Sequence, residues 1–69
     1  MKQAFVLCIE NRDSEDLEKG KVYAVIPDAK AKHEGYLRVV DESGEDYLYP
    51  ESYFVSVDIP AKARGALNM

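Results

Sequence analysis

Short apolar runs alternate along this chain with polar segments that contain glycine or proline. The runs are rich in β-branched and aromatic residues, which is typical of strands rather than helices. The pattern predicts strands over residues 3–11, 21–26, 36–41, 46–49 and 54–58. We therefore expect an all-β domain over residues 1–59. For residues 60–69 we expect a C-terminal tail that is a frayed helix or disordered.

The first run has apolar side chains on both faces of the predicted strand. One face carries Phe5, Leu7 and Ile9, and the other carries Ala4, Val6 and Cys8. A strand with two apolar faces is normally covered on both sides. We expect the second cover to be either the C-terminal tail or another subunit.

The segments between the runs predict loops and tight turns. Residues 11–20 are polar apart from Leu17, which we expect to pin this loop to the core. Residues 29–34 have no apolar stripe and predict an exposed loop or one helical turn. Ser43 and Gly44 lie between two strand patterns and predict a hairpin.

Pro50 ends the fourth predicted strand, because proline cannot donate a ladder hydrogen bond. The next three residues, up to Tyr53, predict a single helical turn before the last strand.

Composition narrows the class of protein. The 69 residues make one domain with a thin core, and the formal net charge is −4. The nine Lys and Arg residues are scattered and outnumbered by acids. A duplex nucleic-acid binder usually carries a basic patch, so the charge argues against nucleic acid as the main partner.

A single cysteine, Cys8, allows no internal disulfide, which favours a reducing compartment. Its place within an apolar run predicts a small buried hydrophobe rather than a reactive thiol. The longest apolar run, residues 4–9, is too short to span a membrane and lacks a signal-peptide cleavage site. We expect a cytoplasmic protein without a membrane partner.

Catalytic chemistry has little support in the sequence. His33 lies in a loop rich in Lys and Glu, without a second catalytic partner. The serines and glycines form no nucleophile or phosphate-binding motif. We expect a protein that is not an enzyme and that needs no cofactor.

Four carboxylates surround the Ser43-Gly44 turn, and a divalent cation could be attracted to them. They are Asp41, Glu42, Glu45 and Asp46. Their spacing does not match a calcium loop, so we expect a solvated acidic hairpin tip and no metal site.

Two segments carry a resemblance to a known family. Residues 16–25 read Asp-Leu-Glu-Lys-Gly-Lys-Val-Tyr-Ala-Val, and residues 49–54 read Tyr-Pro-Glu-Ser-Tyr-Phe. The first resembles the Phe-Lys-Lys-Gly-Asp segment and second strand of Src-homology-3 domains, and the second resembles their Pro-Ser-Asn-Tyr-Val corner. The resemblance covers residues 16–58. It implies a five-stranded SH3-like small barrel with a short helical turn before the last strand.

The chain departs from that family in three places. Residues 4–8 replace its Ala-Leu-Tyr-Asp-Tyr strand, residues 35–37 stand where it has paired tryptophans, and the first loop is shorter. The chain also resembles a group of small, uncharacterised bacterial proteins that share its Gly-Lys-x-Tyr and Asp-Glu-Ser-Gly-Glu-Asp-Tyr-Leu-Tyr-Pro pieces. That second resemblance implies no function.

The family resemblance also implies which side chains face the core. Leu17 would plug one end of the barrel, and Leu48 would lie on the outer face of the fourth strand. The side chains implied to point inward are Tyr23, Val25, Leu37, Val39, Tyr49 and Phe54.

Tyr36, Pro50 and Tyr53 match positions that line the polyproline groove of Src-homology-3 domains. The resemblance implies that they contact a protein or peptide partner. We expect the acidic loop of Asp13, Glu15 and Asp16 to lie beside them and to steer a basic or proline-rich ligand. The alternative is that Pro50 and Tyr53 only build the corner.

These features favour a small bacterial interaction module that binds a protein or peptide. A nucleic-acid-associated small barrel is one alternative, and a clustered basic face would favour it. A structural subunit or homodimer, with the first strand buried between chains, is the other.

Overall fold

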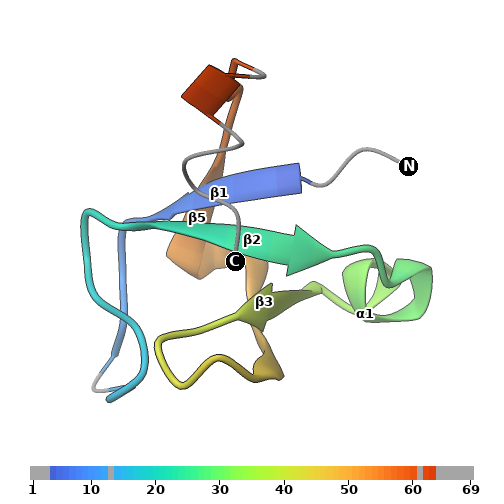
Figure 1. The fold of residues 1–69 in the computed structure, drawn as a ribbon. Helices are drawn as coiled ribbons and strands as arrows, with labels where there is room; N and C mark the ends of the chain where they lie inside the picture. The colour runs from blue at the N-terminus through green and yellow to red at the C-terminus, as the bar shows by residue number, and fades with distance from the viewer. Residues whose placement is uncertain (1–3, 13, 61, 64–69) are drawn as a thin grey trace.

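The computed structural model describes residues 4–12, 14–60 and 62–63. The chain forms one antiparallel sheet of five strands in the order β4-β3-β2-β1-β5 (Figure 1). The strands are β1 (Ala4–Cys8), β2 (Val22–Ile26), β3 (Tyr36–Val40), β4 (Asp46–Pro50) and β5 (Phe54–Val57). A short helix, α1 (Ala29–His33), joins β2 to β3, and a 3-10 turn, η1 (Glu51–Tyr53), joins β4 to β5. The predicted all-β class and the helical turn before the last strand are confirmed.

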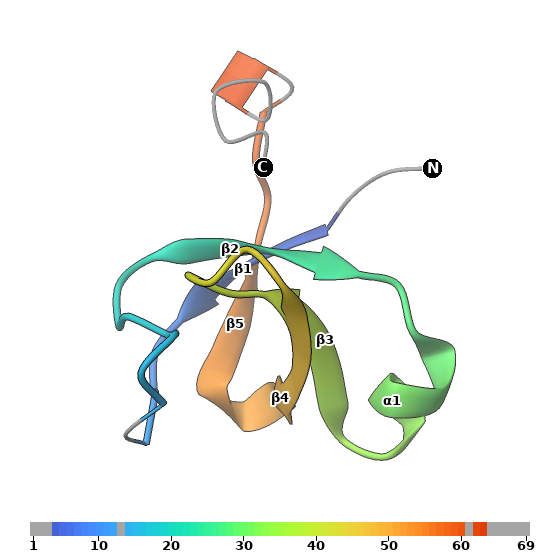
Figure 2. The same ribbon diagram turned by 60° about the horizontal axis from the view of Figure 1, so that its bottom comes forward.

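The sheet curls so that its two edge strands approach each other (Figure 2). The rings of Tyr49 on β4 and Phe54 on β5 meet nearly edge to face, with centroids 6.3 Å apart. Between the described residues of β4 and β5 no strand pairing closes the sheet. The η1 turn spans the gap, and the amide of Glu51 donates to the carbonyl of Gly35 at 3.0 Å.

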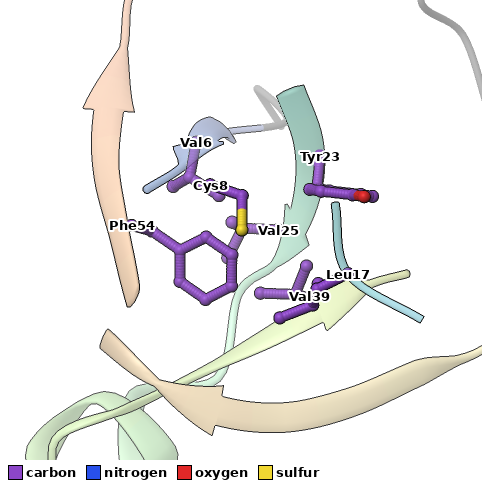
Figure 3. Close-up of a cluster of buried hydrophobic side chains, with 7 residues drawn as sticks. All are labelled: Val6, Cys8, Leu17, Tyr23, Val25, Val39 and Phe54. Carbon is purple, nitrogen blue, oxygen red and sulfur yellow. The ribbon is translucent and has the colours of Figure 1, made fainter. Parts of the chain in front are cut away.

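The core occupies the inner face of this curl (Figure 3). Its buried members are Val6, Cys8, Leu17, Tyr23, Val25, Val39 and Phe54, with Leu37, Tyr49 and Tyr53 packed against them. All the side chains predicted to point inward therefore lie in or against the core. Cys8 is buried as predicted, and burial raises the pKa of its thiol.

The predicted cover on both faces of β1 is correct only in part. Phe5, on the outer face, is buried, but Ile9 beyond the end of β1 is exposed. The predicted strand over residues 3–11 is also too long, since β1 ends at Cys8 and residue 3 lies outside the described residues. The amides of Ile9 and Glu10 both donate to the carbonyl of Tyr53, so the chain leaves the ladder there.

The turns follow from local chemistry. Asp28 caps α1, because its Oδ1 accepts from the amide of Ala31 at 3.0 Å. Gly44 in the β3–β4 turn has a φ of +85°, which glycine adopts at little cost. Of the predicted tail over residues 60–69, the structure describes Pro60, Lys62 and Ala63, and the rest lies outside the described residues.

Candidate functional site

The outer face of the β3–β4 hairpin presents apolar side chains to solvent. Strand alternation turns Leu37, Val39 and Tyr49 toward the core, so their neighbours point outward. Tyr36 lies directly opposite Pro50, and the next outward pair is Arg38 opposite Leu48. We call Tyr36, Leu48 and Pro50 the hairpin patch.

Two members of the hairpin patch are exposed large hydrophobics. Tyr36 is 41% exposed, Leu48 is similarly exposed, and Pro50, which directly precedes η1, is half-buried. Exposed aromatic and aliphatic groups that lie side by side mark binding surfaces more often than isolated ones do. The sequence prediction for Tyr36 and Pro50 thus identifies two residues that the fold places in contact register.

Arg38, the register partner of Leu48, is held by two carboxylates. Arg38 Nε donates to Asp28 Oδ2 at 2.9 Å, and its Nη1 donates to Asp46 Oδ2 at 3.0 Å. Hydrogen bonds from Asp46 and Asp28 raise the pKa of Arg38, so the guanidinium stays charged. The two carboxylates neutralise Arg38 locally, and the hairpin patch itself is an uncharged surface.

Tyr53 has a mainly structural role. Its carbonyl accepts from Ile9 at 2.8 Å and from Glu10 at 3.2 Å. Its half-buried ring packs against the core, 6.3 Å from the ring of Phe54. The alternative that this residue builds the corner accounts for these contacts.

The acidic loop does not join the hairpin patch. Asp13 lies outside the described residues, and Glu15 and Asp16 are exposed. The carbonyl of Asp16 accepts from the amide of Glu42, which lies beyond the C-terminal end of β3, whereas Tyr36 begins that strand. Six residues of extended chain span about 20 Å. Leu17 explains this placement, because its burial draws the neighbouring loop toward the β3–β4 turn.

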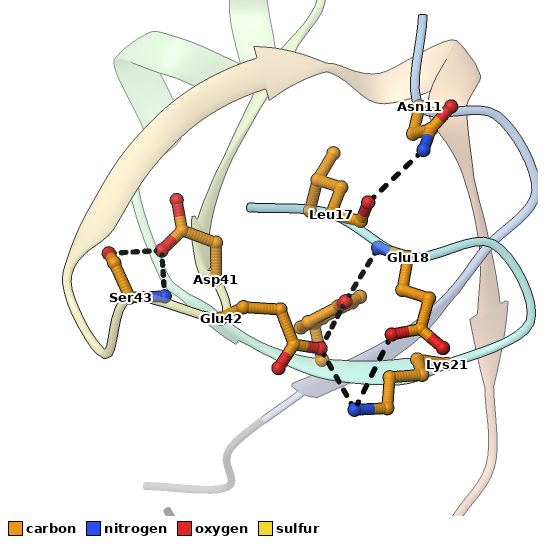
Figure 4. Close-up of polar contacts among 8 residues, drawn as sticks. Asn11, Leu17, Glu18, Lys21, Asp41, Glu42 and Ser43 are labelled. Atoms are coloured by element: carbon orange, nitrogen blue, oxygen red, sulfur yellow. Dashed lines mark hydrogen bonds and ion pairs between the residues drawn. The ribbon is translucent and has the colours of Figure 1, made fainter. Parts of the chain in front are cut away.

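The prediction of a solvated acidic tip is wrong for Asp41 (Figure 4). This residue is only 5% exposed, and its Oδ1 accepts from the amide of Ser43 at 3.0 Å and from the Ser43 hydroxyl. Its Oδ2 accepts from the Tyr49 hydroxyl at 2.7 Å. Burial raises the pKa of Asp41, but the bonds from Ser43 and Tyr49 outweigh that effect and hold the pKa below its usual value.

Glu42 also has a structural task. Its Oε2 accepts from the Tyr23 hydroxyl at 2.7 Å and from Lys21 Nζ at 3.1 Å. These two bonds lower the pKa of Glu42. The Tyr23 hydroxyl also accepts from the amide of Glu18 at 2.8 Å, so this network ties the loop before β2 to the hairpin turn (Figure 4).

The sequence contained one indication that Asp41 and Glu42 accept hydrogen bonds from buried groups. Tyr23 and Tyr49 are inward-facing tyrosines, and a buried hydroxyl needs a partner. Asp41 and Glu42 directly follow β3. At this end of the strand they accept the hydrogen bonds of the Tyr49 and Tyr23 hydroxyls. Burial raises the pKa of each tyrosine well above its ordinary value.

In the part of the chain that the structure describes, no group of three or more His, Cys, Asp and Glu side chains is placed to hold a metal ion. No helix among the same residues has the length and apolar character that crossing a bilayer requires. Comparisons with models of known protein families, with characterised proteins and with solved structures find no match.

Proposed function

We propose that this chain is a Src-homology-3-like small barrel that acts as an interaction module and binds a protein or peptide partner through the hairpin patch. The strand order, the 3-10 turn before β5 and the contact between Tyr49 and Phe54 across the edges all support the barrel. The observation that carries the function is the register pair of exposed Tyr36 and half-buried Pro50, on the same outer face as exposed Leu48.

The chemistry of the hairpin patch favours an extended, proline-containing ligand. Aromatic and proline surfaces hold such segments because the ligand is already extended and loses little conformational entropy on binding. Glu51 follows Pro50 directly, is exposed, and has no ion pair among the described residues. A basic residue of the ligand would meet this carboxylate rather than those of the loop around Asp16.

The test is a titration of the isotopically labelled protein with a short proline-rich peptide that carries flanking arginines. We expect amide shifts at Tyr36, Leu48 and Glu51 that saturate and that weaken with added salt. Tyr36→Ala should abolish them. Tyr47→Ala is the matched control, because Tyr47 is 49% exposed on the same hairpin but lies outside the hairpin patch.

Equal loss of binding in the two tyrosine variants would contradict the proposal. A peptide that shifts only residues far from β3 and β4 would contradict it as well.

Self-association is a second candidate function, favoured by one observation. Leu7 and Val55 are register partners on the outer face of β1 and β5, and exposed Ile9 directly follows β1. This is the surface on which the first strand could meet another subunit. Sedimentation equilibrium of the parent and of Val55→Glu would decide: a dimer should become a monomer, and a monomeric parent would exclude this function.

Ion pairs reduce the support that three of the described cations give to the nucleic-acid alternative. Arg12, Lys21 and Arg38 each pair with a carboxylate, which reduces the positive potential they offer to a phosphate backbone.

A further inference from the structure

The two ends of the curled sheet differ in how well side chains fill them. At the end beside the β3–β4 turn, buried Leu17 fills the space between the strands. At the other end, beside α1, the structure has a cavity of about 360 Å³. Figure 2 shows α1 and the loop that carries Leu17 at opposite ends of the sheet. No member of the hairpin patch lines the cavity, although Arg38, the register partner of Leu48, does.

The floor of this cavity is the inner face of the sheet. Ala4 and Val25 are register partners, as are Val6 and Ser56, so all four share the face that carries the core. Leu37 of β3 completes the floor. This floor is therefore apolar apart from the Ser56 hydroxyl. A mainly apolar surface with a few polar groups is the usual composition of a small-molecule pocket.

The rim of the cavity carries three ionisable residues, Asp28, Lys32 and Arg38. Arg38 pairs with Asp28 at 2.9 Å and with Asp46 at 3.0 Å, so these three groups add no net positive charge. Lys32 has no ion pair among the described residues, so its ammonium group is left to face solvent and any guest.

The volume limits the guest. Liquid water occupies about 30 Å³ per molecule, so the cavity has room for about a dozen groups of that size. It also falls at the small end of the range for ligand pockets, roughly 300–1,000 Å³. A guest that fills it has an apolar body of a few carbon–carbon bonds and one polar end.

We propose that this cavity binds a small amphipathic carboxylate, with its hydrocarbon body on Val6, Val25 and Leu37 and its carboxylate at Lys32. The apolar floor would take the body out of water, and the ammonium group of Lys32 would donate to the carboxylate. The unpaired ammonium group of Lys32 would favour an anionic head group over an amine.

Octanoate is the probe for this site, with 1-octanol as its neutral counterpart. Titration of the labelled full chain with octanoate should give saturable amide shifts at Val6, Val25, Leu37 and Ser56, below the concentration at which octanoate forms micelles. Octanol should bind more weakly than octanoate.

Two lysines of α1 provide a matched pair of variants. Lys32 lines the cavity, and Lys30, two residues earlier on the same exposed helix, does not. Lys32→Gln should weaken octanoate binding about tenfold, the effect typical of a lost charge-assisted hydrogen bond, and should leave octanol binding unchanged. Lys30→Gln should bind octanoate as the parent does.

Three results would overturn the proposal. Equal weakening by the two lysine variants would mean non-specific attraction, and octanol bound as tightly as octanoate would exclude a role for the head group. An absence of saturable shifts would exclude the cavity as a ligand site. Ser56→Leu adds an independent check, since it should fill the cavity and block octanoate while the protein keeps its melting temperature; if it fails to fold, the lysine pair still decides.

Discussion

The hydroxyl of Tyr49 donates a hydrogen bond of 2.7 Å to Oδ2 of Asp41, the one buried charged residue in the described part of the chain. Tyr49 lies on β4 and Asp41 directly follows β3, so the bond closes the hairpin from inside. Ser43 occupies the other carboxylate oxygen. An inward tyrosine and a buried acid, each costly alone, thus satisfy each other at the edge of a thin core.

A double-mutant cycle on this pair should show strong coupling. Asp41→Ala should reduce the free energy of unfolding by about 2 kcal/mol, because the Tyr49 hydroxyl and the Ser43 amide lose their acceptor. Tyr49→Phe should cost about 1 kcal/mol, and the double variant should cost less than the sum of the two. Urea unfolding measures all three. The exposed bond from Tyr47 to Glu45 supplies the control, since Tyr47→Phe should change stability by less than about 0.5 kcal/mol.

Additive effects of Asp41→Ala and Tyr49→Phe would show that the bond does not contribute in solution.

Acid should destabilise the protein through the same turn. Asp41 and Glu42 both have a lower pKa in the folded chain than their ordinary values. The unfolded chain therefore takes up protons first, and stability is complete above about pH 5 and lost as the pH falls below about 4. Melting temperatures from pH 7 to pH 2.5 should follow this course. Asp41→Asn, already less stable at neutral pH, should lose less on acidification than the parent, and identical pH profiles would contradict the assignment.

The core was predicted well because strand alternation is a local property, which shows which side chains share a face. The resemblance to Src-homology-3 domains implied that the face with Val25, Val39 and Phe54 is the inner one, and these three residues lie in the core. The end of β1 could not be assigned this way. Ile9 continues the apolar pattern, and only the carbonyl of Tyr53, far along the chain, takes its amide out of the ladder.

The candidate site was harder to predict because it depends on contacts between segments that are distant in the sequence. Tyr36 and Pro50 belong to neighbouring strands, and their pairing follows from the hairpin. The expectation that the loop around Asp16 lies beside Tyr36 depended on which end of β3 this loop approaches. Buried Leu17 holds the loop near the C-terminal end of β3, away from Tyr36. A polar loop with one apolar residue does not reveal from its sequence which end of a strand it will approach.

Two valines on different faces test the direction of the curl. Val39 is fully buried, whereas Val55 is 43% exposed on β5. Val39→Ala should lower the free energy of unfolding by about 1–3 kcal/mol, through lost burial and the cavity left behind. Val55→Ala should cost less than about 0.5 kcal/mol. Denaturant midpoints of the two variants measure this difference directly. Equal midpoints would contradict the assignment of Val39 to the core face and of Val55 to the outer face.

The last prediction concerns Asp28, which has two separable tasks. Its Oδ1 accepts from the Ala31 amide and caps α1, and its Oδ2 pairs with Arg38. The bond from Ala31 and then the bond from Arg38 lower the pKa of Asp28. Asp28→Ala removes both functions, whereas Asp28→Ser keeps a capping oxygen and cannot reach Arg38.

Thermal melts at low and high salt separate the two tasks. Asp28→Ala should melt about 4–8 °C below Asp28→Ser, the shift that one lost cap gives a domain of this size, and this gap should not depend on salt. The smaller difference between Asp28→Ser and the parent should shrink as salt screens the pair with Arg38. Asp46→Asn is the matched control, because it removes the other partner of Arg38 without touching the cap. Equal melting temperatures of the Ser and Ala variants would mean that the stability of α1, the helix that carries Lys32, does not depend on its cap.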